Sequence, residues 1–165
     1  MKKLLLLTLL AGTVFAEEPI PQEIIEFTIT GTGNNVTIEQ VHQYKSINQN
    51  IVGNNNTSVI LQSGSGEKLI NSTISGNYNN QYIEQSGSGR AELDISLIGD
   101  YNSATILQAG DIENSAIIHL ENVGGPSTLS LTQTGGPSTE PNQYGVTQFC
   151  ANPAGCSVSV TQTAQ

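Results

Sequence analysis

Amide side chains recur along this chain at intervals that could support hydrogen-bonding chemistry. In one example Gly76 is followed three residues later by Asn79 and nine residues later by Gln85, with Ile83 two residues before the Gln. The pattern G-x-x-N-x-x-x-[I/L]-x-Q occurs five times in register, except that Ser127 stands at the fifth Asn position. The candidate turn glycines are Gly31, Gly53, Gly76, Gly99 and Gly124, and the candidate ladder residues are Asn34, Asn56, Asn79, Asn102, Gln40, Gln62, Gln85, Gln108 and Gln133. A carboxamide both donates and accepts, so copies stacked one strand spacing apart can bond above and below.

The other reactive side chains do not form a catalytic or metal-binding pattern. His42 and His119 lie in different repeats and have no partners at ligand spacing. Motifs typical of zinc proteases, of hydrolase nucleophiles and of phosphate-binding loops do not occur in the sequence. Glu39 and Glu84 directly precede ladder Gln residues, and we expect them to face solvent. We therefore predict that the protein is not an enzyme and needs no cofactor and no metal.

Two cysteines flank the short segment ANPAG near the end of the chain. Cys150 and Cys156 are not spaced as C-x-x-C, and no alternation of strands and helices surrounds them, which argues against a redox pair. In an exported protein such a pair favours a disulfide over a metal site. We predict a disulfide that closes a short loop and therefore stabilises the fold only modestly.

The elements that must position the amides are short strands. Before each turn Gly, apolar residues alternate with polar ones, as in Leu93, Ile95 and Leu97 before Gly99. The alternation continues after the Gly, so each unit is predicted to be a strand, a tight turn at G-x-x-N, a second strand and a linker. A lone hairpin is only marginally stable in water, so we expect successive units to stack. The predicted fold is all-β: a β-solenoid of about five to six strand-turn-strand repeats with parallel stacked rungs.

In the fifth unit, counting back from Gly124 by two, four and six assigns Asn122, Leu120 and Ile118 to the buried side. A degenerate sixth unit at 142–165 also alternates. Its predicted inward residues are Val146, Gln148 and Cys150 on one strand and Cys156, Val158, Val160 and Gln162 on the other. Repeats one to five span 23–141.

The N-terminus has the pattern of a secretory signal peptide. Lys2 and Lys3 precede a short apolar run, and Val14 and Ala16 suit a cleavage site before Glu17. We predict a signal peptide at 1–16, a short mature segment at 17–22 and a secreted, extracellular protein. No later apolar stretch is long enough for a transmembrane span.

The composition excludes some functions. After removal of 1–16, three basic and fourteen acidic residues remain, a net charge of −11. Phosphate binding needs basic patches, so we expect no nucleic acid partner. The high content of Gly and amides would otherwise indicate disorder, but a repeat in register overrides that interpretation.

The repeat resembles that of the curlin family, the secreted amyloid subunits of bacterial curli fibres, written S-x5-Q-x-G-x-x-N-x-A-x3-Q. The second half matches well, as in the segment from Gly99 through Asn102 and Ala104 to Gln108. The first half departs: aliphatic residues such as Ile74 replace the family Gln, and Lys45, Lys68 and Ala91 stand where the family has Ser.

The resemblance implies export by a curli-type secretion apparatus and assembly into cell-surface fibres for adhesion and biofilm matrix. The expected partners are copies of the chain itself and a related nucleator or major subunit. Open strand edges at both ends of a solenoid favour the same end-on addition, which acidic turn residues such as Asp100 and Asp111 would slow. The alternative is a monomeric secreted β-solenoid that binds a surface or a polysaccharide. Irregular outward residues, such as Val59 beside Tyr82, argue against ice binding.

Overall fold

The described part of the chain consists of strands and turns and contains no helix. The structure, a computed structural model, describes residues 4–9, 12–17, 24–41, 45–109, 114–134 and 142–163. The strands are β1 (Leu4–Leu9), β2 (Gly12–Glu17), β3 (Ile24–Thr30), β4 (Asn35–Gln40), β5 (Lys45–Val52), β6 (Thr57–Gln62), β7 (Lys68–Ser75), β8 (Asn80–Gln85), β9 (Ala91–Ile98), β10 (Ser103–Ala109), β11 (Asn114–Asn122), β12 (Ser127–Thr134), β13 (Asn142–Cys150) and β14 (Cys156–Thr163). His42 and Asp111 lie outside the described residues.

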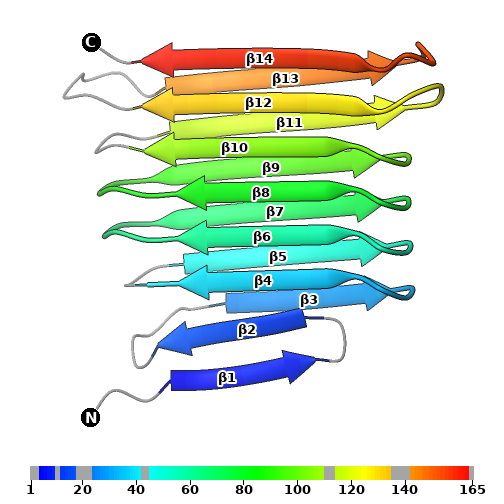
Figure 1. The fold of residues 1–165 in the computed structure, drawn as a ribbon. Helices are drawn as coiled ribbons and strands as arrows, with labels where there is room; N and C mark the ends of the chain where they lie inside the picture. Colours follow the sequence, from blue (N-terminus) through cyan, green and yellow to red (C-terminus); the bar gives the residue numbers. More distant parts are fainter. Residues whose placement is uncertain are drawn as a thin grey trace.

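The strands β3 to β14 wind into a β-solenoid with two sheets facing each other. The even-numbered strands form one sheet in the order β4-β6-β8-β10-β12-β14, which β2 and β1 extend, and the odd-numbered strands form the other from β3 to β13. Neighbours within each sheet of the solenoid are parallel, and each belongs to successive units (Figure 1). The predicted fold class is confirmed.

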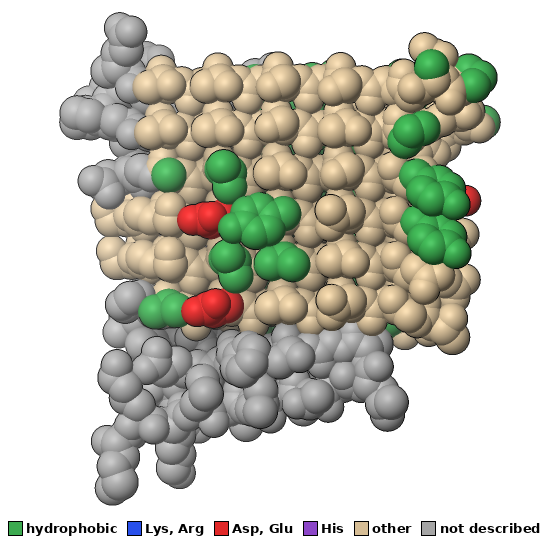
Figure 2. All heavy atoms as spheres, viewed as in Figure 1, with side chains coloured by type: hydrophobic (Ala, Val, Ile, Leu, Met, Phe, Trp, Pro, Cys, Tyr) green, Lys and Arg blue, Asp and Glu red, His purple; other side chains and the backbone are tan. Residues whose placement is uncertain are grey.

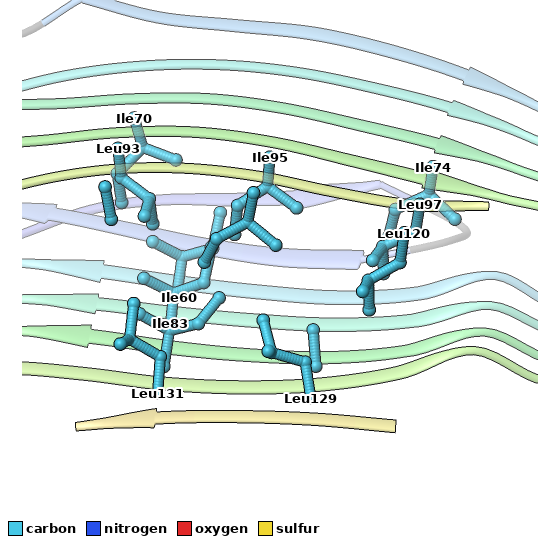
Figure 3. Packing of buried hydrophobic residues seen from close by; sticks show 14 of the residues in the cluster. Ile60, Ile70, Ile74, Ile83, Leu93, Ile95, Leu97, Leu120, Leu129 and Leu131 are labelled. Atoms are coloured by element: carbon cyan, nitrogen blue, oxygen red, sulfur yellow. The ribbon is translucent and has the colours of Figure 1, made fainter. Parts of the chain in front are cut away.

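The core is built from columns of identical or similar side chains. Ile60 lies opposite Ile83, and Ile83 lies opposite Ile106, and all three are fully buried. Ile74 and Leu97 form a comparable column in the other sheet, visible in Figure 3. Burying each such side chain is worth about 1.5–3 kcal/mol, so the columns supply the main driving force that a single hairpin lacks.

The turns within each unit also stack, and their glycines are placed by that stacking. Gly53 has a φ of 129°, in a region that side chains rarely adopt, and a Cβ there would overlap the carbonyl oxygen of Gly76 in the next unit. The backbone amide of Gly53 donates to Thr30 O at 2.8 Å, which ties the turn to the unit before it. A glycine is required here because one turn approaches the next so closely.

The fifth unit differs from the prediction by two residues. Leu120, not Asn122, lies opposite Leu97, and it is Asn122 that lies against Gly99. Gly124 instead approaches Ala151 of the last turn. Six residues at 122–127 span the turn that four residues, 99–102, span in the unit before. The extra length is even, so the predicted inward faces of Ile118 and Leu120 remain right, but the alignment on Gly124 was wrong.

The segment predicted to be a signal peptide contains β1 and most of β2. β1 pairs antiparallel with β2, and β2 pairs in parallel with β4, placing Ala16 opposite Gln40. Residues 18–22 of the predicted mature N-terminal segment lie outside the described residues. Cleavage before Glu17 stays a prediction.

Candidate functional site

The ladder glutamines form one continuous chain of hydrogen bonds inside the solenoid. Each Nε2 donates to Oε1 of the Gln in the following unit, at 2.7 Å from Gln40 to Gln62 and 2.9 Å from Gln62 to Gln85. The chain continues through Gln108 and Gln133 at 2.7 Å for each step and reaches Gln162 in the sixth unit at 3.0 Å. The five predicted residues are buried, so each unpaired amide would carry a desolvation cost that the ladder removes.

The asparagines form a second ladder whose side-chain amides point the other way. Asn56 Nδ2 donates to Asn34 Oδ1 at 3.1 Å, and Asn79 Nδ2 donates to Asn56 Oδ1 at the same distance. The same Asn79 amide also donates to Gly99 O at 2.8 Å, and its oxygen accepts from Asn102 N at 2.8 Å. The three inner members, Asn56, Asn79 and Asn102, therefore each join their own turn to the turns on both sides.

The fifth member of this ladder is a residue that the sequence pattern missed. Asn122 Nδ2 donates to Asn102 Oδ1 at 2.7 Å. Ser127, at the pattern's Asn position, is buried, and its hydroxyl has no hydrogen-bond partner in the described part of the chain. The signal was the 25-residue interval of this unit, two residues longer than the one before it, which moves Asn122 into the turn.

A third, exposed ladder runs along the residue that follows each turn Gly. Thr32 N donates to Asn54 Oδ1 at 2.9 Å, Asn54 N donates to Asn77 Oδ1 at 2.9 Å, and Asn77 N donates to Asp100 Oδ1 at 2.6 Å. The next residue in this column is Val123, which has no side-chain oxygen to accept from Asp100 N, so the series ends at Asp100. The acidic residue that we expected to oppose association thus also terminates a ladder.

A cluster of four polar side chains links the two sheets in the middle of the core. Gln49 Nε2 donates to Ser58 Oγ at 2.6 Å, and Ser72 Oγ donates to Gln81 Oε1 at 2.8 Å. Gln81 Nε2 completes the set by donating to Ser58 Oγ at 3.2 Å. Alternation places all four residues inward, but their pairing across the sheets depends on how the sheets face each other, which spacing does not give.

Lys68 is buried at the start of β7. It is 1% exposed, and its ammonium donates to Gly89 O at 2.7 Å. Burial lowers the pKa of Lys68 below the usual 10.5. Among the described residues no carboxylate pairs with its ammonium. The even spacing of Lys68 from Gly76 was the signal that its side chain points inward.

The two cysteines form a disulfide with their Cα atoms 5.7 Å apart. Cys150 is fully buried at the end of β13, and Cys156 begins β14. The bond closes the last turn of the solenoid. The two strands that this turn connects, β13 and β14, each pair with only one neighbouring strand.

The outer surface of the even-numbered sheet carries an apolar group beside two carboxylates. Figure 2 shows hydrophobic side chains gathered over β6 to β10, next to acidic groups. Val59 lies opposite Tyr82, and Leu61 lies between Glu39 and Glu84. The Tyr82 hydroxyl donates to Glu84 at 2.9 Å, and this hydrogen bond is the main cause that raises the pKa of Tyr82.

The two ends of the solenoid differ from its interior in burial. Inward apolar residues are fully buried in the internal rungs, but Phe27 and Ile29 of β3 and Val158 and Val160 of β14 are only partly buried. No described strand pairs with the outer edges of β3, β13 or β14. These ends therefore expose both apolar side chains and unpaired backbone groups.

The described residues do not assemble a metal site. No group of three or more His, Cys, Asp and Glu side chains among them is placed to hold an ion. His119 lies 3.6 Å from a Glu121 oxygen on the outer face of β11, and Arg90 pairs with Glu92. Among the described elements there is also no helix able to span a membrane.

No family model, no curated protein and no solved structure matches this chain.

Proposed function

We propose that this chain is the structural subunit of an extracellular, curli-like amyloid fibre that grows by end-on strand addition and serves adhesion and the biofilm matrix. Its partners in this proposal are further copies of itself, a related nucleator or major subunit, and a curli-type secretion apparatus. The resemblance of the repeats to curlin repeats motivates the proposal. The observation that carries the proposal is that both ends of the solenoid have unpaired strand edges and partly buried apolar side chains.

The ends match each other in register and chemistry. If the pairing of internal rungs continued into a second copy, Val158, Val160 and Gln162 of one copy would lie opposite Val36, Ile38 and Gln40 of the next. Apolar residues would meet apolar residues, and a Gln would meet a Gln. Contact of this kind would complete the burial that Val158 and Val160 lack in the single chain.

The ladder supplies a direction for that contact. Its bonds all run from Nε2 of one unit to Oε1 of the following unit, and Gln40 Oε1 is buried without a hydrogen-bond partner among the described residues. Gln40 is thus the acceptor end of the series. Ala16 lies opposite Gln40 in the full chain, and cleavage before Glu17 would remove it and expose this edge of β4.

The proposal is tested with the chain beginning at Glu17. We expect sedimentation velocity to show conversion of monomer to large polymers over hours, and diffraction from the polymers to show reflections near about 4.8 and 10 Å. A chain that stays monomeric and gives no such reflections would contradict the proposal.

A further inference from the structure

Two tyrosines occupy a backbone conformation that bulky residues rarely adopt. Tyr78 has a φ of 58° and Tyr101 a φ of 61° at the third position of their turns. The first two units place Gly33 and Asn55 there, and these residue types tolerate positive φ. The chain therefore accepts strain of order 1 kcal/mol at each tyrosine where Gly or Asn would avoid it.

The two rings form an exposed, stacked platform. Their centroids lie 5.1 Å apart with an interplanar angle of 5°, so the two rings are stacked in parallel. Tyr78 is 53% exposed and Tyr101 is 60% exposed. Such stacking returns about 0.5–1.5 kcal/mol and fixes the orientation of both rings.

A groove opens beside the second ring. It has a volume of about 460 Å³ and is lined by Tyr101, Asp100, Asn122 and Val123, together with Pro126 and Pro153. The turn after β11 is two residues longer than the turn at 99–102 and contains no aromatic residue, so the column of rings ends at Tyr101. Figure 2 shows hydrophobic side chains at this turn end of the solenoid, with an acidic group beside them.

Two polar side chains, those of Asp100 and Asn122, line the groove beside the platform. Asp100 Oδ1 accepts from Asn77, whereas Oδ2 makes no hydrogen bond within the described part of the chain. Asn122 Nδ2 donates to Asp100 O and to Asn102 Oδ1, and these two hydrogen bonds fix the Asn122 carboxamide at the groove. The site therefore combines an apolar face, the Tyr101 ring, with a hydrogen-bond acceptor, Asp100 Oδ2.

We propose that this groove binds a pyranose ring of a neutral, β-linked polysaccharide. The C–H face of such a sugar is apolar and flat enough to continue the column above Tyr101, and its hydroxyls can donate to Asp100 Oδ2. An acidic polysaccharide is disfavoured by Asp100 and by the chain's net negative charge. The ring and the acceptor of the site, Tyr101 and Asp100, lie in the turn between the internal strands β9 and β10, so the site does not require polymerisation.

The test uses cellohexaose as the probe and isothermal titration with freshly purified chain. Tyr101→Asn removes the ring but keeps a residue that the same position tolerates in the second unit, where Asn55 has a φ of 55°. We expect this variant to fold and to bind cellohexaose at least about tenfold more weakly, the loss equivalent to 1.4 kcal/mol. Asp100→Asn tests the acceptor and should also weaken binding.

A matched control removes a different tyrosine. Tyr82→Thr changes an outward ring on the face of the sheet to the residue type of its neighbour Thr105, and binding should not change. No binding by the unaltered chain, equal binding by Tyr101→Asn, or equal binding of polygalacturonate would each overturn the proposal. Polymerisation of Tyr101→Asn, followed in parallel by sedimentation, should be unchanged, so failure of this site and failure of fibre assembly are separate results.

Discussion

Gln85 donates from Nε2 to Oε1 of Gln108 at 2.7 Å, and the two residues lie directly opposite each other in neighbouring parallel strands. The same Gln85 accepts from Gln62 at 2.9 Å. One side chain thus holds three successive rungs in register, which a column of aliphatic residues cannot do because apolar packing has no direction.

Replacing Gln85 by Ala should therefore destabilise the solenoid more than its loss of volume alone. The change leaves the Gln62 donor and the Gln108 acceptor without their partner and opens a cavity, and we expect a loss of about 2–4 kcal/mol in the free energy of unfolding. Urea unfolding of the monomer measures this loss, and the rate of polymerisation should fall as well. Glu39→Ala, on the exposed face, is the control and should stay within about 0.5 kcal/mol of the unaltered chain. Equal effects of the two variants would remove the structural role given to the ladder.

Gly53→Ala should be one of the most damaging single changes in the chain. The added Cβ would overlap the Gly76 carbonyl oxygen at a positive φ, so the turns must separate, and we expect at least about 3 kcal/mol of destabilisation or failure to fold. Gly145→Ala is the matched control, because a Cβ at that position in β13 meets nothing within 4 Å. Its free energy of unfolding should lie within about 1 kcal/mol of that of the original chain. Similar midpoints for both variants would contradict the close stacking of the turns.

Removal of the disulfide should loosen one end of the solenoid only. Its two cysteines are 6 residues apart, and a loop that short implies about 2 kcal/mol of stabilisation. We expect hydrogen exchange in a Cys150→Ala/Cys156→Ala variant to speed up in β13 and β14, with β7 and β8 unchanged. Faster exchange throughout the solenoid would mean that the last rung governs the whole fold.

Lys68 should make stability depend on alkaline pH. Burial lowers its pKa in the folded chain below 10.5, so the unfolded chain binds more protons between the folded pKa and 10.5. Stability should accordingly rise with pH across that interval, as the buried ammonium loses its proton. Lys68→Met should be more stable than the original chain at pH 7, and the difference should shrink towards pH 10.5. A variant less stable at pH 7 would show that the hydrogen bond to Gly89 O outweighs the cost of burial.

Much of the fold follows from the sequence because the repeat fixes register and parity together. Once Ile83 and Gln85 are assigned inward, a fixed interval assigns Ile60, Gln62 and their counterparts in every rung. The continuation of the ladder to Gln162 and the position of the cysteines follow from the same alternation.

What alternation could not give are the contacts between the two sheets and the conformations of the turns. The link between Gln49 and Ser58 depends on how the two sheets face each other, and the flat stack of Tyr78 on Tyr101 depends on the conformation of two turns. The replacement of Ser127 by Asn122 in the ladder follows from a two-residue insertion, which leaves parity unchanged and so cannot be detected by alternation.

The measurement that tests end-on addition most directly is the axial rise per subunit in fibres of the chain beginning at Glu17, obtained by helical reconstruction from electron micrographs. Strands β3 to β14 make six rungs, and at about 4.8 Å for each rung end-on addition predicts a rise of about 29 Å per chain, with the Gln ladder continuous across every junction. A rise of about 4.8 Å per chain would mean that each molecule lies flat in a single layer. That result would contradict assembly through the ends of an intact solenoid.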